Sequence, residues 1–398
     1  MKIRVGVLFG GVSVEHEISI ISAVQAMQSM DTNKYEIIPI YMAKDRTWYT
    51  GKMLMDVEVY KDFEDLKKYA TKINLINKEG KFCLQSTGLF KRVVDEIDIA
   101  FPIVHGANVE DGTLQGYLDT IGVPYVGSSV LGSALGQDKV VMKQIFEAVG
   151  LPIVPYLWFY DDEYLNEGDE ITKKVKKLGY PVIVKPATLG SSVGITVVKC
   201  EDDLEMAIMD AITYDNKIVV EKLVENMTEV NCSVLGDYKY QQTSVLEEVM
   251  STDEFLTYKD KYISGGKGKT GAKGMVATDR IIPARLTEEM AEEVRELSKK
   301  VFKVLNLSGI CRIDYLIDKK KNKVYINEPN TIPGSLSFYL WEPIDKEYNE
   351  LLDEDINIAI KRFKEKSKKV YSFETNVLSG FGGLKGTKGL KGSKGKLR

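Results

Sequence analysis

The sequence predicts an α/β protein whose first domain is a doubly wound, parallel sheet. Three apolar segments with strand character lie at 5–9, 35–41 and 97–104. Between the first two, apolar residues recur at three- and four-residue spacing after Ser13, which predicts an amphipathic helix capped by that serine. Strand–helix–strand order is typical of sheets in which consecutive strands run parallel.

Helix and strand patterns continue along the rest of the chain. Asp138 precedes a helical stretch that runs to about Val149, where Gly150 and Pro152 end it. The stretch 48–94 shows no clear pattern, so no element is predicted there. Apolar runs predict strands at 180–185, 195–199, 219–221 and 229–235, a long helix at 286–305, and a hairpin of 310–317 with 323–328.

Composition indicates a folded protein of two or three domains. The 398 residues are 44% hydrophobic and 28% charged, which is enough apolar material for a buried core. The net charge of −4 gives no overall attraction to nucleic acid. Six cations and no acids follow Gly380, which predicts a solvated basic tail without a fixed fold. This tail could attract an anionic partner or be a passive extension.

Cysteine usage and hydropathy bear on the compartment. None of the four cysteines forms a C-x-x-C pair, which argues against a zinc ribbon, an iron–sulfur cluster or a disulfide scaffold. No apolar run approaches the roughly 18 residues of a membrane span, and the apolar start is too short for a secretory signal. The sequence therefore predicts a soluble, cytoplasmic protein.

The predicted C-terminal hairpin gathers four polar side chains. Residues two apart on a strand share a face, so Arg312 joins Asp314 and Glu328 joins Asn330. A single register places Arg312 opposite Asn330 and Asp314 opposite Glu328. Two carboxylates and an amide oxygen form a set that suits Mg²⁺ bridging phosphates. The alternative is a surface hairpin with cross-strand ion pairs.

A lysine closes the apolar strand that ends at Lys185. An ammonium there is costly to desolvate unless an anion meets it. The Gly/Ser loop 189–194 that follows offers backbone N–H groups and hydroxyls, as loops that cradle phosphates do. The alternative is a lysine that reaches to solvent beside a tight hairpin.

Two glycine-flanked segments, 10–17 and 105–112, follow the carboxyl ends of predicted strands, where open α/β sheets bind ligands. Glu15 could hold a substrate ammonium, and His105 could contact the carboxylate of the same substrate. Alternatively, Glu15 only complements a helix dipole, and Glu110 with Asp111 caps the next helix. The residues alone leave both interpretations open.

Together, these motifs resemble those of the D-alanine–D-alanine ligases of the ATP-grasp superfamily, in the family's order over residues 3–365. The segments that carry the resemblance are Gly10-Gly11-x-Ser13-x-Glu15, His105-Gly106, Glu110 to Gly116, Asp138-Lys139, Val184-Lys185-Pro186, Gly190 to Gly194, Glu221-Lys222, Tyr258-x-x-Lys261-Tyr262, Arg312-Ile313-Asp314, and Asn327-Glu328-x-Asn330-Thr331-x-Pro333-Gly334.

The resemblance implies an ATP-grasp ligase of three domains. These are an N-terminal domain at 1–137, a small ATP lid subdomain at 138–220 and a C-terminal subdomain at 221–370, before a Lys/Gly-rich tail at 371–398. The implied activity joins two D-alanines through an acyl phosphate, with ATP converted to ADP, for peptidoglycan precursor synthesis. The resemblance further implies a cytoplasmic homodimer, with D-alanine and ATP as substrates.

The resemblance also implies a role for each matching residue. Contacts to ATP fall to Lys139, Lys185, Ser192 and Lys261 at the phosphates, to Glu221, Lys222 and Val224 at the adenine, and to Glu229 at the ribose. Asp314, Glu328 and Asn330 would bind two Mg²⁺ ions, or Mn²⁺ in their place. The amino acids and the oxyanion fall to Glu15, His105, Arg312 and the Gly334 N–H, with Tyr262 linking Glu15 to Ser191.

The chain departs from the family pattern in four places. His16 stands where Arg is frequent, Val109 replaces a usual Gly, and the loop 263–275 is longer and rich in Gly and Lys. Tyr339 occupies the place of a serine that anchors the second substrate's carboxylate. Tyr262 matches the ligases that form dipeptides, which favours an amine nucleophile.

Two alternatives to the D-alanyl-D-alanine activity stay open. One is a D-alanine ligase with another second substrate, such as D-serine, in which Tyr339 either donates to the substrate or forms a repacked wall. The other is a non-catalytic nucleotide-binding module.

Overall fold

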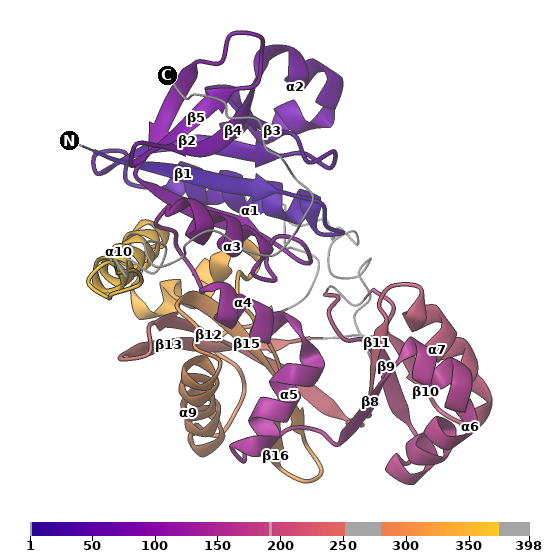
Figure 1. The fold of residues 1–398 in the computed structure, drawn as a ribbon. Helices are drawn as coiled ribbons and strands as arrows, with labels where there is room; N and C mark the ends of the chain where they lie inside the picture. The colour runs from indigo at the N-terminus through magenta and orange to yellow at the C-terminus, as the bar shows by residue number, and fades with distance from the viewer. Residues whose placement is uncertain (1, 191–192, 251–279, 374–398) are drawn as a thin grey trace, which may run out of the picture. The chain divides into compact units, whose positions relative to one another are not determined.

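The computed structural model describes residues 2–190, 193–250 and 280–373, and its described strands form three sheets (Figure 1). Each sheet has a separate main cluster of buried apolar side chains. The chain divides into two compact units, residues 1–361 and 362–398, and all three sheets belong to the first.

The first sheet has seven strands in the order β6-β5-β4-β3-β2-β1-β7. Strand β1 pairs in parallel with both β2 and β7, while the strands from β2 to β6 pair antiparallel. The elements of this region are β1 Ile3–Gly10, α1 His16–Ser29, β2 Tyr35–Met42, β3 Trp48–Thr50, η1 Lys52–Met55, η2 Val57–Lys61, α2 Phe63–Tyr69, β4 Thr71–Lys78, β5 Lys81–Ser86, β6 Val93–Ile97, β7 Ile99–Val104, α3 Thr113–Ile121 and α4 Val130–Gln137.

The α/β class is confirmed, but the first sheet is mixed rather than wholly parallel. The stretch 48–94, for which no element was predicted, supplies the antiparallel strands β3 to β6. A two-residue turn joins β4 to β5, with Glu79 and Gly80 both at positive φ (54° and 83°). Such turns suit the twist of an antiparallel hairpin, so these strands pair side by side instead of crossing over.

The predicted start of the first helix was wrong by a few residues. Helix α1 begins at His16 with Glu15 at its N-cap position. The Ser13 hydroxyl accepts a hydrogen bond from the Glu15 N–H (3.1 Å) and so orders the turn before the helix. The cap at Asp138 is confirmed, because its carboxylate accepts from the N–H groups of Val140 and Val141.

The second sheet has four strands in the order β10-β9-β11-β8, and its described pairs are antiparallel. Its core includes Phe159, Ile171, Val184 and Ile208, so helices as well as strands contribute. The elements of this region are β8 Tyr156–Tyr160, α6 Asp161–Leu178, β9 Val182–Pro186, β10 Thr196–Val198, η3 Glu201–Asp203, α7 Leu204–Ile212 and β11 Lys217–Lys222. The preceding helix, α5 Lys139–Ala148, packs through Met142 and Phe146 in the core of the third sheet.

The third sheet, in the order β14-β13-β12-β15-β16, carries the predicted polar hairpin. Arg312 lies opposite Asn330 and Asp314 opposite Glu328, which confirms the register inferred from strand periodicity. After Asp314 the register shifts by one residue, where the hairpin bulges. The elements are β12 Met227–Gly236, β13 Gln241–Val249, β14 Arg280–Ile281, α9 Glu288–Val304, β15 Gly309–Asp318 and β16 Lys323–Asn330.

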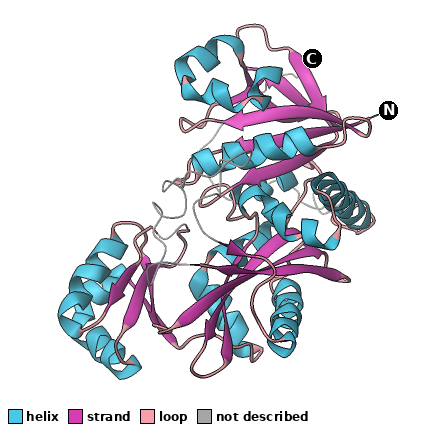
Figure 2. Cartoon of the chain, turned by 180° about the vertical axis from the view of Figure 1, so that it is seen from behind, coloured by secondary structure: helices cyan, strands magenta, loops and turns pink. Residues whose placement is uncertain are grey.

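The segment after β16 belongs to the core of the first sheet. It comprises η4 Gly334–Leu340, η5 Glu342–Ile344 and α10 Tyr348–Lys366. Leu340, Trp341 and Leu352 are fully buried in the same cluster as Phe9 and Met27. In Figure 2 the helices appear in cyan beside the magenta sheets that they cover. Among the described residues, no helix is long and apolar enough to cross a membrane.

Candidate active site

One pocket collects residues from widely separated parts of the chain. It is lined by seven of the predicted site residues, namely Glu15, His105, Lys139, Arg312, Glu328, Asn330 and Gly334. They come from the turn after β1, the loop after β7, the start of α5, and the hairpin β15–β16 with the residues that follow it. Four predicted residues, Ser191, Ser192, Lys261 and Tyr262, lie outside the described part of the chain.

Three of the hairpin side chains form a hydrogen-bonded set around the buried Asp314, rather than a surface ion pair. The Asp314 carboxylate, 5% exposed, accepts from Arg312 Nε (2.7 Å) and Nη2 (2.8 Å), and from Asn330 Nδ2 (2.9 Å). Burial lowers the pKa of Arg312, but the paired Asp314 outweighs it and raises that pKa well above its ordinary value. The guanidinium therefore stays charged at the edge of the pocket.

Lysines pair with two carboxylates near the pocket, Glu328 on β16 and Glu221 on β11. Lys139 Nζ lies 3.2 Å from Glu328 Oε2 and also donates to the Leu189 carbonyl (2.8 Å). Lys185 Nζ donates to Glu221 Oε2 (2.9 Å). Lys185 therefore meets an anion, but the anion that it meets in the protein is a glutamate that the resemblance assigned to adenine.

Glu221 also forms an ion pair with a second lysine, Lys143, for which no role was predicted. Its other oxygen, Oε1, lies 3.1 Å from Lys143 Nζ in an ion pair without hydrogen-bond alignment. Burial opposes ionisation of Glu221, but Lys143 and Lys185 outweigh it and hold its pKa at about 2. Glu221 thus acts on the two lysines through a permanent negative charge.

Glu15 lies against two glycines in the pocket wall. A Cβ on Gly106 would approach Glu15 Oε2 to 2.9 Å and would also clash with Ser13 Oγ, and Gly106 has a φ of +82°. A Cβ on Gly190 would lie 3.4 Å from the same Glu15 oxygen, which is an ordinary contact. Since a side chain at Gly106 would displace the carboxylate, glycine is required there. This placement supports a role for Glu15 beyond that of a helix-dipole partner.

His105 lines the pocket with both ring nitrogens engaged by the protein. Nδ1 lies 2.8 Å from the Ile332 carbonyl oxygen and Nε2 lies 3.0 Å from Ser22 Oγ. Burial lowers the pKa of His105 below its ordinary value, so the ring is neutral near pH 7. A neutral ring that donates through Nδ1 accepts from Ser22. His105 therefore joins α1 to the loop after β16 and shapes the pocket.

Glu110 is a pocket residue that the sequence assigned only to a helix cap. Its carboxylate accepts from the N–H groups of Gly106 and Ile332 (both 2.9 Å) and from the Thr331 hydroxyl (3.0 Å). Burial first, and then the charge of Glu15, raise its pKa to about 7, although these donors favour the ionised form. Gly112 occupies the N-cap position of α3, and Asp111, one residue earlier, accepts a hydrogen bond from the Thr113 N–H, so Glu110 does not cap this helix.

None of the four residues assigned to the nucleoside lines this pocket, and the three besides Glu221 have other surroundings. Lys222 Nζ donates to the carbonyls of Gly179 and Tyr180 (both 2.9 Å) and so closes the turn before β9. Val224 packs on a small apolar cluster that includes Val154. Glu229 lies on β12, and its charge is one of those that raise the pKa of Lys185.

Comparison with known proteins identifies the family of this chain. The family model described as D-ala D-ala ligase C-terminus matches residues 145–355, and the one described as D-ala D-ala ligase N-terminus matches residues 4–128. A D-alanine–D-alanine ligase of Thermosipho melanesiensis is 42% identical over 378 residues, with 94% of this chain and 98% of the relative covered. The chain belongs to the D-alanine–D-alanine ligase family.

Two solved structures have the same fold. The VanG D-Ala:D-Ser ligase from Enterococcus faecalis matches with a TM-score of 0.75 and 28% identity, over 90% of this chain and all of that one. The D-alanine–D-alanine ligase from Bacillus anthracis complexed with ATP matches with a TM-score of 0.64 and 26% identity, over 92% and 99% of the two chains. The predicted ATP-grasp ligase fold is confirmed.

Two of this ligase's departures from the family pattern have local explanations. His16 is buried, with Nδ1 2.6 Å from the Gly11 carbonyl oxygen and Nε2 3.0 Å from the Tyr41 hydroxyl. Val109 is also buried and lies over Gly11, where a Cβ would approach its Cγ1 to 2.6 Å. Both side chains are thus fitted to the turn that carries Glu15.

Tyr339, the departure nearest to the chemistry, has its hydroxyl committed within the ligase. It donates to Glu247 Oε2 (3.0 Å), while the Arg280 guanidinium lies 4.8 Å from the centre of the Tyr339 ring. Arg280 Nε in turn lies 3.1 Å from Glu247 Oε1. Burial first, and then Glu247, raise the pKa of Tyr339 to about 12. This geometry fits the repacked wall better than a phenol directed at a substrate.

Proposed function

We propose that the pocket joins two D-alanine molecules to D-alanyl-D-alanine, with ATP converted to ADP and phosphate. The observation that carries this proposal is the convergence of Glu15, Arg312 and Lys139 on one pocket. A carboxylate there complements a substrate ammonium, and two cations complement a carboxylate and phosphates. Membership of the family and the name of the Thermosipho melanesiensis relative support D-alanine as the substrate.

The proposed chemistry has two steps. A carboxylate oxygen of the first D-alanine attacks the γ-phosphorus of ATP, the bond from this phosphorus to the bridging oxygen breaks, and ADP leaves as the acyl phosphate forms. The amine of the second D-alanine then attacks the acyl carbon, loses a proton, and phosphate leaves. Arg312 and the Gly334 N–H would stabilise the oxyanion of the tetrahedral intermediate, since charge develops there in a partly dry site. Lys139 and Lys185 would bind the phosphates.

The donor set of the hairpin fits Mg²⁺, or Mn²⁺ in its place. Asp314, Glu328 and Asn330 would hold two ions through carboxylate and amide oxygens, the ligands that these hard cations prefer. Asn330 Nδ2 donates to the Asp314 carboxylate (2.9 Å), so the amide lies beside that carboxylate and its oxygen would be the third ligand of the set. Bound there, the ions would supply positive charge to the transferring phosphoryl group.

D-Alanine is the second substrate that the relatives favour. The related structure named a D-Ala:D-Ser ligase shows that the fold also accommodates D-serine in another chain.

A purely nucleotide-binding module is disfavoured by the relatives, such as the D-alanine–D-alanine ligase of Thermosipho melanesiensis, which are named as ligases. A homodimer in the cytoplasm stays a proposal from the family resemblance, and sedimentation of the purified protein tests the dimer. The tail beyond residue 373 lies outside the described residues.

The substrate assignment is tested by phosphate release with a panel of acceptors. The purified protein is incubated with ATP, Mg²⁺ and either D-alanine alone, D-alanine with D-serine, or D-alanine with D-lactate. Phosphate release is measured, and the products are identified by mass spectrometry. We expect D-alanine alone to support turnover and to give the dipeptide as the main product. Phosphate release only in the presence of D-serine would show that D-serine, and not D-alanine, is the second substrate. No phosphate release with any acceptor would refute the ligase activity.

A further inference from the structure

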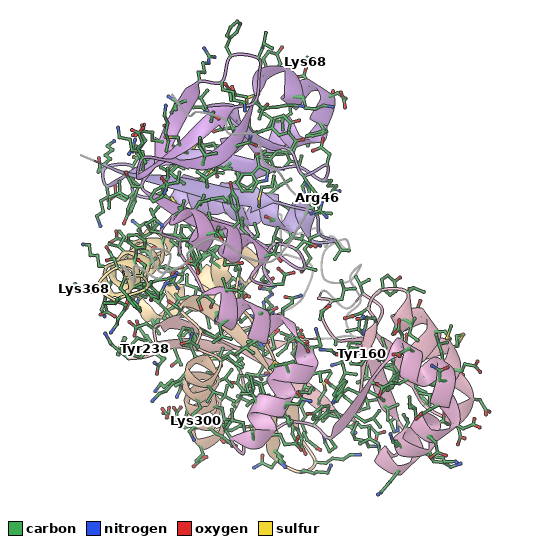
Figure 3. All side chains as sticks on the ribbon, viewed as in Figure 1. Arg46, Lys68, Tyr160, Tyr238, Lys300 and Lys368 are labelled. Carbon is green, nitrogen blue, oxygen red and sulfur yellow. The ribbon has the colours of Figure 1, made fainter. Side chains whose placement is uncertain are left out.

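One buried lysine has no part in the proposed reaction. Lysines usually lie at the surface, as Lys68 and Lys300 do in Figure 3, whereas the Lys143 side chain is 0% exposed. It lies one helical turn after Lys139 on α5, and its Nζ is 5.7 Å from the centre of the Tyr156 ring. A buried ammonium is costly unless it is paired, so its position calls for a physical explanation.

The partner of Lys143 is shared with a second lysine. Glu221, 1% exposed, places one oxygen 3.1 Å from Lys143 and accepts at the other from Lys185 (2.9 Å). One negative charge thus faces two positive charges. Glu328 and Glu229 also attract Lys185, but Glu328 is paired with Lys139. The triad of Lys143, Glu221 and Lys185 retains a positive charge that favours an added anion.

Exposure decides which of the two lysines can reach that anion. The Lys185 side chain is 8% exposed and stands at the end of β9, whereas the Lys143 side chain is fully enclosed. If Lys143 were absent, Glu221 and Lys185 would form a one-to-one pair, and the charge of Lys185 would be cancelled. Lys143 therefore governs how strongly Glu221 competes for Lys185.

We propose that Lys143 is a positioning residue that neutralises Glu221 and so leaves Lys185 available to the phosphates of a bound nucleotide. The inference rests on the proposed use of ATP. It predicts that Lys143 affects binding of the phosphates and not of the nucleoside. It also predicts that the effect of Lys143 requires the carboxylate of Glu221.

A double-mutant cycle tests this dependence. Affinities for Mg·ADP and for adenosine are measured by calorimetry, without D-alanine, on the full chain carrying Lys143→Met, Glu221→Gln or both. Lys143→Met should weaken ADP binding by roughly tenfold or more and leave adenosine binding unchanged. In the Glu221→Gln background the same change should alter ADP binding less than about threefold, because no carboxylate remains to retain Lys185. Any direct contact of Glu221 with the nucleoside cancels from this comparison.

Matched variants separate positioning from a loss of structure. Lys143→Arg, which keeps the charge, should retain most of the ADP affinity. Lys346→Met, at a lysine whose side chain is 16% exposed, is the control for the loss of an ion-paired lysine. If Lys143→Met does not fold, Lys143→Gln takes its place in the cycle. Equal ADP affinity in wild type and variant, or the same loss in both backgrounds, would overturn the proposal. Failure of the wild-type protein to bind ADP would instead refute the proposed use of ATP.

Discussion

Glu110 is an acid whose surroundings pull its pKa in opposite directions. Three hydrogen-bond donors favour its ionised form, while burial and the nearby Glu15 favour the protonated form and prevail, with a pKa of about 7. The pKa of Glu110 in the folded protein lies above its ordinary value of 4.5, so the folded protein binds the proton more tightly than the unfolded chain does. Glu110 therefore contributes stability below about pH 4.5, and this contribution is lost as the pH rises through about 7.

Glu110→Gln should remove this pH dependence. We expect the variant to be destabilised by more at about pH 5 than at about pH 8, with a difference of a few kcal/mol at most. Urea unfolding of both proteins at the two pH values gives the comparison, and Asp111→Asn, next to it and more exposed, is the matched control. The same destabilisation at both pH values would mean that Glu110 titrates as an ordinary glutamate.

Tyr339 gives a second prediction at this scale. Because its hydroxyl donates to Glu247, Tyr339→Phe should lower the free energy of unfolding by about 1–3 kcal/mol, through a buried acceptor that loses a donor. The KM for the second D-alanine should change less than about threefold, since the phenol is not directed at the substrate. Steady-state kinetics with the D-alanine concentration varied checks this point. A large rise in that KM with normal stability would show that the phenol binds the substrate.

The hairpin β15–β16 shows what element-scale patterns can predict. Strand periodicity was enough to align Arg312 with Asn330 and Asp314 with Glu328, because both pairs satisfy one register. The same reasoning could not find Lys143, which reads as an ordinary lysine of an amphipathic helix. Its partner Glu221 lies on β11, and no local pattern connects the two segments. The contact of Tyr339 with Glu247 was hidden for the same reason.

The hairpin also identifies the better residue for testing the metal assignment. Asp314 pairs with the partly buried Arg312, so Asp314→Asn would leave that guanidinium poorly paired and would destabilise the fold. The Glu328 side chain is 27% exposed, so Glu328→Gln should leave the unfolding midpoint nearly unchanged. It should lower turnover by roughly a hundredfold or more, because charge at the transferring phosphoryl group is lost.

Turnover and thermal unfolding of Glu328→Gln are compared with those of Glu292→Gln, an exposed variant on α9. Near-normal turnover of a folded Glu328→Gln protein would be incompatible with a metal held by this hairpin.

At the scale of the whole molecule, the core of the first sheet is completed by residues from the other end of the chain. Leu340, Trp341 and Leu352 are buried in the same cluster as Phe9 and Met27. The sequence predicted the strands of this sheet near the N-terminus but not this partner, because packing between distant segments leaves no periodic signal. The continuation of the chain beyond Gly334 therefore joins the hairpin β15–β16 to the sheet that carries Glu15.

This packing predicts that α10 supports the site from a distance. Leu352→Ala should lower the free energy of unfolding by about 2–5 kcal/mol, the usual cost of a cavity at a fully buried leucine. The KM for the first D-alanine should change little at a temperature where the variant stays folded. Urea unfolding and kinetics on the same sample check both points. An unfolding free energy equal to that of the wild type would place α10 outside the core.

The central claim is that a carboxylate of D-alanine is phosphorylated and then coupled to a second amine. Oxygen transfer tests it most directly, with D-alanine carrying ¹⁸O in both carboxylate oxygens and ordinary ATP. Since the attacking oxygen leaves with the phosphate, each turnover should yield phosphate with one ¹⁸O and a dipeptide whose peptide carbonyl keeps the other. Phosphate that contains no ¹⁸O, released together with dipeptide, would contradict the acyl-phosphate route and the roles assigned to Arg312 and Lys139.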